Sequence, residues 1–564
     1  MRLIGALIVL GTISFFYRLG GVGLVGPDES RYAEVSRGML ERGDWVTPEL
    51  RGEPWLHKPP LFYWFAAASM WVLGETEAAA RLPSAVAALG TCLSIGFLGA
   101  RLFGSASGIR SAVVLASSLG MVLYGRAAIM DSLLTFFLTL GLGAYLVYAT
   151  ARPSKVRPSN PGWRLRLGTA GRPSNPGRLL PLGTAGRPSQ IWLAVAYAAF
   201  GASVLAKGPV GIVLPLLIMF VFEVVSHRRV LPKPRSLLTS AASFLAVVAP
   251  WHIAILNAQG WEYVESFLFQ HNLDRFLTTI HRHPGPFYYY LPILVVALVP
   301  WTAFIPRAVW SGFRNRDPRR VFLLLWIGVP LVFFSLAGSK LPGYILPILP
   351  PLSLLVGTFW TDESRTEEPG ARWLGRPLAF HVGLSIVLGA AAVYGFGSRL
   401  PAIVEGGWAL GSLVIVLSVA TYLLGRRRPR VAFRSLVGSS VILTLVLVLY
   451  AAPLMEPYKS LKTLASMGFA ELAPDEQVIC YKSFYPQAHF YTQDRLGEIW
   501  TLEEFRIRVV EWGRIVTLTE PHRFQELVDE PSLRTRVMAE CGGKILAEAS
   551  PAPPGQRSRD DARP

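Results

Sequence analysis

Long apolar runs alternate with short polar loops along most of this chain of 564 residues. Four of the clearest runs cover residues 111–124, 133–148, 212–225 and 436–452. A helix crosses a hydrocarbon core of about 30 Å with roughly 17–25 residues, and each run approaches that length. Only 16% of the residues are charged, against about 25% in soluble proteins. The pattern predicts an α-helical polytopic membrane protein with about 13 transmembrane helices.

The polar loops between the runs are of two kinds. The first kind is strongly basic and covers residues 101–110, 152–187, 228–235, 307–320 and 426–430. The second kind mixes polar and aromatic residues and includes residues 26–60, 124–131, 257–286 and 339–344. Because Lys and Arg favour the cytoplasmic side, we expect the basic loops inside and the mixed loops outside. The lipid bilayer thus accounts for the formal net charge of +18, and the charge gives no reason to expect a nucleic-acid partner.

The helix expected at residues 61–74 decides this orientation. With about 14 residues it would be roughly 21 Å long, which is short for a span. If it crossed the membrane, the polar residues before it would lie on the same side as the basic loops. We therefore expect it to lie along the membrane surface, within an outside first loop of residues 21–74. The apolar stretch before this loop lacks a small-residue cleavage site and is expected to be an uncleaved first span.

Composition divides the chain into a membrane domain (residues 1–455), a small C-terminal domain (residues 456–550) and a disordered tail (residues 551–564). In the C-terminal domain, EQVICYKSFY, AHFYTQ, RIVTLTE and KILAEAS resemble strands. LEEFRIRVVEW and HRFQELVDE resemble helices, so we expect an extracytoplasmic α/β fold in which two cysteines can pair. Within the membrane domain, residues 151–190 repeat RPSNPG and LGTAGRPS, which predicts a disordered cytoplasmic loop.

The residues with candidate chemistry gather in the loops assigned to the outside. Ionisable groups beside a bilayer are costly, so a functional site is the first hypothesis for them. These groups are Asp28, Glu29, Arg31, Tyr32, His57, Lys58, Asp131, Lys207, His271, Arg275, Lys340 and Tyr344. A carboxylate can take a proton from an attacking hydroxyl, and Lys and Arg can hold a phosphate by charge-assisted bonds. Together they suit transfer of a sugar from a lipid phosphate, with Asp28 as the base and inversion at the anomeric carbon.

Each group also has a structural interpretation. Asp28 and Glu29 would stabilise the N-terminus of an amphipathic helix at residues 31–40. The lysines would reach the membrane interface from the ends of spans, and the histidines would be ordinary polar loop residues. Asp131 would pair with Arg126 at the end of a span.

Six short motifs occur in one order along roughly the first 350 residues: D-E-x-R-Y, K-P-P-L, R-x-A-x-x-D, K-G-P, H-N-x-x-R-F and S-K-L-P-x-Y-x-L-P. In this order they resemble the lipid-phosphate-sugar glycosyltransferases of the aminoarabinose-transferase and protein-mannosyltransferase type. The resemblance implies a GT-C fold, an extracytoplasmic active site and a polyprenyl-phosphate sugar donor. It also implies that Asp28 is the catalytic carboxylate, with Arg31, Lys58, Lys207 and Arg275 near the donor phosphate.

We accordingly assign Asp28, Glu29 and Asp131 to catalysis. The groups assigned to the donor phosphate are Arg31, Tyr32, Lys58, Lys207, Arg275, Lys340 and Tyr344. The aminoarabinose branch implies an acidic residue before the Lys of K-P-P, as part of a metal site with a later histidine. This chain has His57 at that position. A His57–His271 pair is therefore the candidate site for a divalent metal, since imidazole suits zinc.

The leading hypothesis is an enzyme of the inner (plasma) membrane that transfers a hexosyl or pentosyl group to an extracytoplasmic acceptor. That acceptor is a glycolipid such as lipid A, a polysaccharide or a protein. A transporter or flippase for a lipid-linked anionic substrate is the alternative. Transporters bind substrate near the bilayer midplane and show internal repeats, whereas here the charges gather at one surface. A ligase or polymerase using pyrophosphate-linked oligosaccharides would keep the fold and change the donor.

Overall fold

The computed structural model of the protein describes residues 2–151, 190–226, 234–274, 285–315, 317–364, 372–399, 403–468, 472, 476–485, 487–493 and 495–553. The repeat segment between residues 151 and 190, the tail from residue 554 and the side chain of Arg275 lie outside these ranges. The expectations for them stay predictions.

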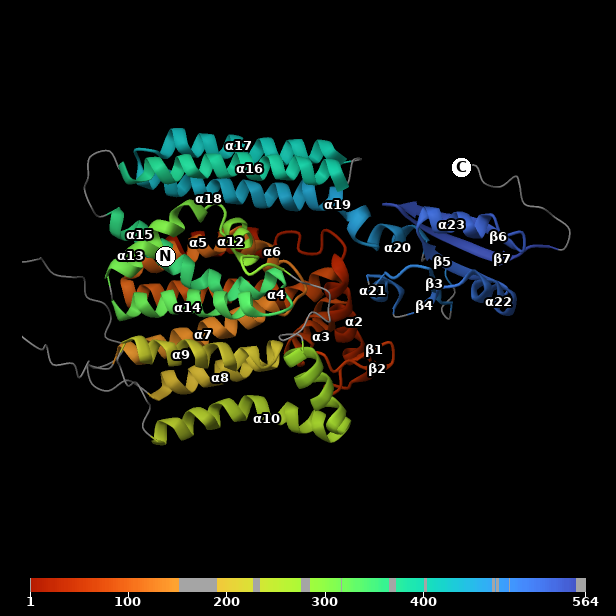
Figure 1. Cartoon of the computed structure of the whole chain (residues 1–564), viewed down its shortest axis with the longest axis horizontal. Helices are drawn as coiled ribbons and strands as arrows, with labels where there is room; N and C mark the ends of the chain where they lie inside the picture. Colours follow the sequence, from red (N-terminus) through yellow and green to blue (C-terminus); the bar gives the residue numbers. More distant parts are fainter. Residues whose placement is uncertain are drawn as a thin grey trace, which may run out of the picture.

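Most of the described chain is a bundle of helices that run along one common direction (Figure 1). Within the described ranges, nine helices are long and apolar enough to cross a membrane, or eleven if two bent pairs each count as one span. The nine are built on α4 (Glu77–Phe103), α7 (Asp131–Thr150), α8 (Gln190–Lys207), α10 (Pro234–Val264), α14 (Pro318–Leu336), α15 (Leu349–Glu363), α16 (Gly375–Arg399), α17 (Val404–Gly425) and α18 (Pro429–Val446). The predicted polytopic membrane fold is confirmed, while the count of 13 spans stays a prediction.

The bundle also contains broken helices. The pair α5 (Ser105–Ala116) and α6 (Leu119–Gly125) bends by 63°. The pair α12 (Tyr290–Ala297) and Thr302–Asn315 bends by 112°. A 3-10 turn, η4 (Pro342–Ile348), leads into α15. Broken helices place backbone groups and side chains at one end of a bundle, where a membrane protein can build a site.

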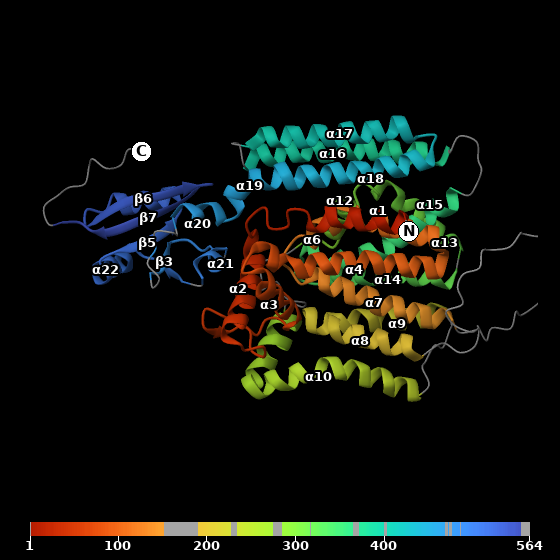
Figure 2. The ribbon, with the colours of Figure 1, turned by 180° about the vertical axis from the view of Figure 1, so that it is seen from behind.

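Two helices of the first loop lie across the end of the bundle that carries the C-terminal domain (Figures 1 and 2). These are α2 (Gly26–Arg42) and α3 (Leu61–Leu73). The 13 residues of α3 would extend over about 20 Å, and the helix ends at Gly74 with a φ of 77°. Its length and its place beside α2 agree with the predicted surface helix.

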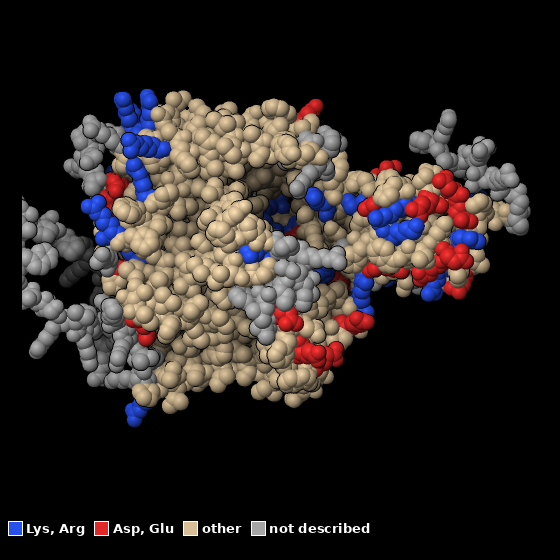
Figure 3. Space-filling view, in the orientation of Figure 1, with Lys and Arg blue, Asp and Glu red and all other residues tan. Residues whose placement is uncertain are grey.

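Charged residues are distributed unevenly along the bundle axis. Lys and Arg gather at the end opposite the C-terminal domain, whereas the flank of the bundle is almost free of charge (Figure 3). The arginine run between α17 and α18 belongs to that basic end. An uncharged flank between two polar ends is the surface that a bilayer requires.

The C-terminal domain follows the last span through α19 (Ala452–Lys459) and contains one five-stranded sheet. The strand order is β4-β3-β5-β7-β6, with β4, β3 and β5 parallel and the β6–β7 pair antiparallel. The strands are β3 (Val478–Tyr481), β4 (Leu496–Ile499), β5 (Ile515–Thr519), β6 (Leu533–Cys541) and β7 (Lys544–Pro551). The helices are α20 (Lys462–Gly468), α21 (Ala488–Thr492), α22 (Leu502–Trp512) and α23 (Pro521–Val528). Strands β3 and β5 are buried along their whole length, as expected for parallel strands covered by helices.

The structure confirms the α/β character of this domain and corrects three details. The segment AHFYTQ, expected as a strand, forms the short helix α21. Strands β4 and β6 were not expected, because β4 is only four residues long and β6 is largely exposed. The two cysteines that could have paired do not: Cys480 on β3 and Cys541 on β6 are separated by β5 and β7, and both thiols are free.

Candidate functional site

Helix α2 presents the first pair of candidate carboxylates. Its first turn contains Pro27, Asp28 and Glu29. Proline presets the φ of a first helical turn, and acidic side chains interact favourably with the N-terminal end of the helix dipole. The helix ends at Gly43, which has a left-handed φ of 67°. Asp28 and Glu29 are neighbours in sequence, but they leave the helix on different faces and meet different surroundings.

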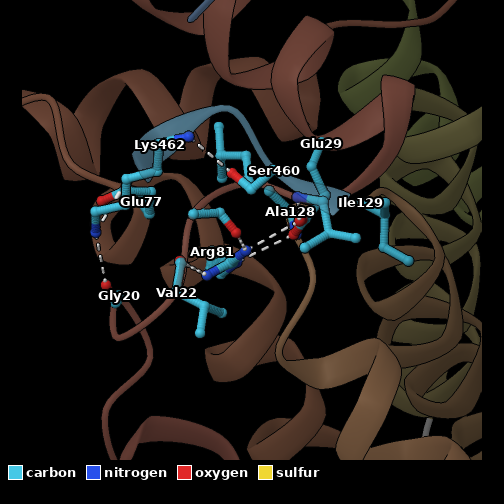
Figure 4. Close-up of polar contacts among 12 residues, drawn as sticks. Gly20, Val22, Glu29, Glu77, Arg81, Ala128, Ile129, Ser460 and Lys462 are labelled. Atoms are coloured by element: carbon cyan, nitrogen blue, oxygen red, sulfur yellow. Dashed lines mark hydrogen bonds and ion pairs between the residues drawn. The ribbon is translucent and has the colours of Figure 1, made fainter. Parts of the chain in front are cut away.

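Glu29 is buried and fully hydrogen-bonded (Figure 4). Its carboxylate accepts bonds from Arg81 Nε at 3.1 Å and Arg81 Nη2 at 3.0 Å. It also accepts the backbone N–H groups of Val25 and Ala128, each at 2.6 Å. Each carboxylate oxygen therefore has two donors, which points to a structural role in place of the catalytic role predicted for Glu29.

Arg81, on α4, is a residue that the motifs do not include. Its Nη1 donates to the carbonyls of Leu19 at 3.0 Å and Val22 at 2.8 Å. Its Nη2 donates to the carbonyl of Gly23 at 2.8 Å. A buried ion pair persists when all its hydrogen bonds are satisfied, and here the guanidinium fork satisfies three carbonyls and one carboxylate. Arg81 thereby fixes the loop that leads into α2.

Asp28 is accessible, in contrast to Glu29. Its side chain is 52% exposed, and its Oδ1 lies 3.8 Å from Nη1 of Arg31. The guanidinium of Arg31 also lies 6.0 Å from the ring centre of Trp55, within the range of a cation–π interaction. The accessible carboxylate of the pair therefore has a cation beside it.

Three rings lie in a row next to Arg31. The ring centre of Trp55 is 3.9 Å from that of His57, which is 3.6 Å from that of His271. Two imidazoles on one tetrahedral zinc place their ring centres about 5 Å apart, so the two histidines are stacked on each other in this arrangement. Among the described residues, three or more His, Cys, Asp or Glu side chains never gather closely enough to hold a metal ion. The pair as arranged does not fit a zinc site, and no step proposed below uses a metal.

A second cluster forms where α7, α8 and η4 meet. Nζ of Lys207 lies 2.6 Å from Oδ1 of Asp131 and 4.9 Å from the ring centre of Tyr344. Gly343 packs so closely here that a Cβ would lie 2.6 Å from Oδ1 of Asp131. Asp131 thus pairs with Lys207. The alternative partner, Arg126, instead donates to the backbone carbonyls of Ser14, Tyr17 and Arg18 at 2.9–3.4 Å.

Lys340 is buried beside this cluster. It is 6% exposed, and its Nζ donates to the carbonyl of Ala337 at 2.6 Å. The two lysines at the predicted donor site therefore differ, because Lys207 forms an ion pair and Lys340 is held by backbone.

One hydrogen bond connects the two clusters. Glu29, next to Asp28, binds the N–H of Ala128, and Ala128 lies three residues before Asp131. The N-terminus of α2 and the turn before α7 are thus fixed against each other. The predicted site residues from the first loop and from α7 and α8 belong to one end of the bundle.

A cavity of about 550 Å³ opens beside Arg31, the cation next to Asp28, between the first loop and the C-terminal domain. Its lining is Arg31, Leu50, Arg51, Glu53, Pro54, Trp55, His57, Phe484 and His489. Arg51 comes from the hairpin β1–β2 (Glu49–Leu50 and Glu53–Pro54) and binds Glu498 and His489 of the C-terminal domain at 2.9–3.2 Å. Sequence reasoning missed these C-terminal residues, because no motif marks them.

The remaining predicted residues are placed less centrally. Tyr32 is buried, with its ring centre 5.9 Å from those of Phe62 and Tyr63, so it packs in the core between α2 and α3. Lys58 is half-buried in the loop before α3. Arg275 follows the last described residue of η2 (Glu265–Asp274) and is outside the described chain.

Comparison with known proteins identifies relatives of this chain. The family model described as dolichyl-phosphate-mannose-protein mannosyltransferase matches residues 57–156. The undecaprenyl phosphate-alpha-4-amino-4-deoxy-L-arabinose arabinosyl transferase of Pectobacterium atrosepticum is 30% identical over 414 residues, which are 72% of this chain and 67% of the relative. The enzyme of the same name from Serratia proteamaculans is 31% identical over 363 residues, 63% of this chain and 59% of that relative.

The fold has a solved counterpart. The crystal structure of ArnT from Cupriavidus metallidurans bound to undecaprenyl phosphate aligns over 97% of both chains with a TM-score of 0.76 at 20% identity. This agreement confirms the GT-C fold expected from the motifs, including the C-terminal domain. The chain belongs to the family of the undecaprenyl phosphate-aminoarabinose arabinosyl transferases.

Proposed function

We propose that the protein is an integral membrane glycosyltransferase that moves a sugar from a polyprenyl-phosphate donor to an extracytoplasmic acceptor. The names of its relatives give the donor as undecaprenyl phosphate carrying 4-amino-4-deoxy-L-arabinose, so this donor is the first to assay. The observation that carries the proposal is the difference between the two carboxylates. Glu29 has a hydrogen-bond donor for every acceptor position that it uses, whereas Asp28 is half-exposed next to Arg31, which lines an open cavity.

Asp28 takes the proton of the acceptor hydroxyl as its oxygen attacks the anomeric carbon of the donor sugar. The bond from that carbon to the phosphate oxygen breaks in the same displacement, and the configuration inverts. A positioned carboxylate base contributes about 10²- to 10⁴-fold to such a step. The leaving group is a phosphate monoester, which departs as an anion and needs positive charge more than a proton.

The cations around the site supply that charge. Lys207 ends α8 and Lys340 precedes η4, while Arg31 and Lys58 come from the first loop. Arg275 is assigned to the same role from the sequence alone, since it lies outside the described residues. The ion pair with Asp131 positions the ammonium group of Lys207. The aromatic ring of Tyr344 packs against the same ammonium group. Charge-assisted bonds to a phosphate in a partly buried site are strong, so these groups both bind the donor and stabilise its departure.

The acceptor enters through the cavity at the C-terminal domain. Arg31 and His57 both line this cavity, and Nη1 of Arg31 lies 3.8 Å from Asp28. An acceptor held in the cavity therefore has its hydroxyl near Asp28. The cavity lies at the end of the bundle opposite the Lys- and Arg-rich end. Because Lys and Arg favour the cytoplasmic side, the active site faces the outside of the inner membrane.

The test is sugar transfer by purified protein from radiolabelled undecaprenyl-phosphate sugars to a crude envelope acceptor fraction. Asp28→Asn should lower turnover about 10²- to 10⁴-fold and leave binding of undecaprenyl phosphate intact. The matched control is Glu41→Gln on the same helix, since Glu41 is 57% exposed and 3.6 Å from Arg37. Equal turnover of Asp28→Asn and Glu41→Gln would exclude Asp28 as the base. Lipid binding without transfer from any donor would favour a flippase.

A further inference from the structure

The C-terminal domain grips the loop that precedes α2, more than 430 residues away in sequence. The N–H of Gly23 donates to Oε1 of Glu456 at 3.1 Å, and the N–H of Leu24 donates to the hydroxyl of Tyr491 at 2.8 Å. Nζ of Lys462 lies 3.1 Å from Oε1 of Glu77, at the start of α4. Figure 4 shows this contact between Lys462, Ser460 and the first loop.

Gly23 is the closest point of this contact. A Cβ on Gly23 would lie 2.1 Å from Oγ of Ser460, 2.6 Å from Cβ of Lys462 and 2.7 Å from the hydroxyl of Tyr491. Contacts below about 3 Å do not occur between real atoms of this kind, so only glycine permits the C-terminal segment to approach so closely. Hydrogen bonds hold both backbone groups of Gly23, with the N–H on Glu456 and the carbonyl on Arg81.

The hydroxyl of Tyr491 connects the loop before α2 to the start of α4. It accepts the N–H of Leu24 and donates to Oε1 of Glu77 at 3.2 Å. Burial, together with the charge of Glu77, raises the pKa of Tyr491, so the phenol keeps the proton that it donates. The residue is on α21, a five-residue helix whose neighbour Phe490 also accepts a bond from Arg37 of α2 at 3.1 Å.

The loop is therefore held from two sides. Arg81 binds the carbonyls of Leu19, Val22 and Gly23 from inside the bundle, and the C-terminal segment binds the N–H groups of Gly23 and Leu24 from outside. Helix α2 begins at Gly26, and Asp28 is in its first turn. A shift of this loop moves the start of α2, whereas Asp131 and Lys207 lie on α7 and α8, outside the loop.

We propose that Tyr491 is a positioning residue: docking of the C-terminal domain on Gly23 and Leu24 sets the place of the Asp28 carboxylate for catalysis. This inference rests on the function proposed above. A misplacement of about 1 Å can cost about 10²-fold in rate when a reacting group must be aligned. Lys58, Lys207 and Lys340 also serve donor binding and lie outside α2, so donor affinity falls much less than kcat when this contact is weakened.

The test compares two changes that each remove one tyrosine hydroxyl from the same domain. Tyr491→Phe removes the bond to the loop. Tyr481→Phe removes a bond of 3.0 Å to Glu526 on the far side of the sheet. Turnover is measured per binding site for undecaprenyl phosphate, titrated on the same preparation, so that any unfolded fraction cancels. Tyr491→Phe should lower kcat about 10- to 100-fold with the donor KM within about two-fold, while Tyr481→Phe should match the wild type.

A second variant approaches the contact from the other side. Gly23→Ala should push Ser460 and Tyr491 away and reproduce the loss of kcat, together with faster hydrogen exchange at Leu24. The inference is overturned if Tyr491→Phe retains the kcat of Tyr481→Phe, or if both Tyr491→Phe and Gly23→Ala raise the donor KM as much as they lower kcat. Failure of the proposed function has a different signature, because then the wild type itself transfers no sugar or Asp28→Asn keeps full turnover.

Discussion

Replacing Glu29 by Gln tests the buried ion pair of Glu29 and Arg81, which holds the first turn of α2 where Asp28 lies. The carboxylate has two donors on each oxygen: Ala128 N–H and Arg81 Nε on Oε1, and Val25 N–H and Arg81 Nη2 on Oε2. An amide offers one oxygen and one NH₂ group. Whichever way it is turned, its NH₂ group faces two donors, and Arg81 loses the one carboxylate that the described residues place within hydrogen-bonding distance.

The magnitude follows from the burial of both partners. The side chains of Arg81 and Glu29 are 4% and 6% exposed, so solvent does not screen the loss. Removing one partner of such a pair costs about 3–5 kcal/mol. If the loop and the first turn of α2 open locally to relieve it, hydrogen exchange there accelerates about 10²- to 10⁴-fold, since about 1.4 kcal/mol is a factor of ten.

A matched control exists on the same helix. Glu34 forms an equally buried pair with Arg37 at 2.6 Å, but Arg37 also has Glu41 at 3.6 Å and Glu75 at 4.0 Å. Glu34→Gln therefore leaves Arg37 with other carboxylates and should cost only about 1–2 kcal/mol. Exchange of the amides of residues 19–33 and 126–130 is measured by mass spectrometry on detergent-purified protein.

The reasoning is refuted if Glu29→Gln accelerates exchange no more than Glu34→Gln does. It is also refuted if the acceleration is spread evenly over the bundle, because the effect argued here is local to the loop and to the turn before α7.

Two further predictions concern the second cluster and the cysteines. Gly343→Ala should displace Asp131 and weaken binding of undecaprenyl phosphate about 5- to 160-fold, which corresponds to an over-packing cost of about 1–3 kcal/mol. Gly328→Ala, where a Cβ meets no atom within 4 Å, should leave binding unchanged. Burial raises the pKa of the Cys480 thiol to about 12. At about pH 8, iodoacetamide should therefore label only the partly exposed Cys541 in the folded protein and reach the buried thiols after unfolding. Labelling of Cys480 in the folded state would contradict its burial, and a disulfide seen in the intact mass would contradict the strand order of the sheet.

The membrane spans could be predicted from local patterns, and the same patterns carry the expectation for the location of the site. Apolar run length defines a membrane helix, and the Lys/Arg bias separates two kinds of loop, so both features are written in consecutive residues. The same reasoning predicts that the helix at residues 61–74, observed as Leu61–Leu73, lies along the membrane surface. Arg126 was the alternative partner for Asp131 because it is near in sequence, whereas the observed partner, Lys207, is brought in by the packing of α8 on α7.

The residues that position the start of α2, Arg81 and Tyr491, could not be predicted from local sequence patterns. Arg81 lies in the first part of a span-length helix and belongs to no motif, and only the folded structure shows that three carbonyls and Glu29 converge on it. Tyr491 is in a segment that alternates like a strand but forms a five-residue helix, because its ends are fixed by docking on α2 and not by its own propensity.

The hydrogen bond between Leu24 and Tyr491 also has a consequence for biogenesis. The two residues are separated by 467 positions, so at about 5–20 residues per second the ribosome needs roughly 25–90 s to reach the second after the first. Glu29 and Arg81 are only 52 positions apart and can pair within roughly 3–10 s. The first loop thus acquires its inner contact early in synthesis, and its outer contact only after the last span and the domain that follows it have been synthesised. A chain whose synthesis stops before that point carries every charged group of the site and still lacks the contact that completes it.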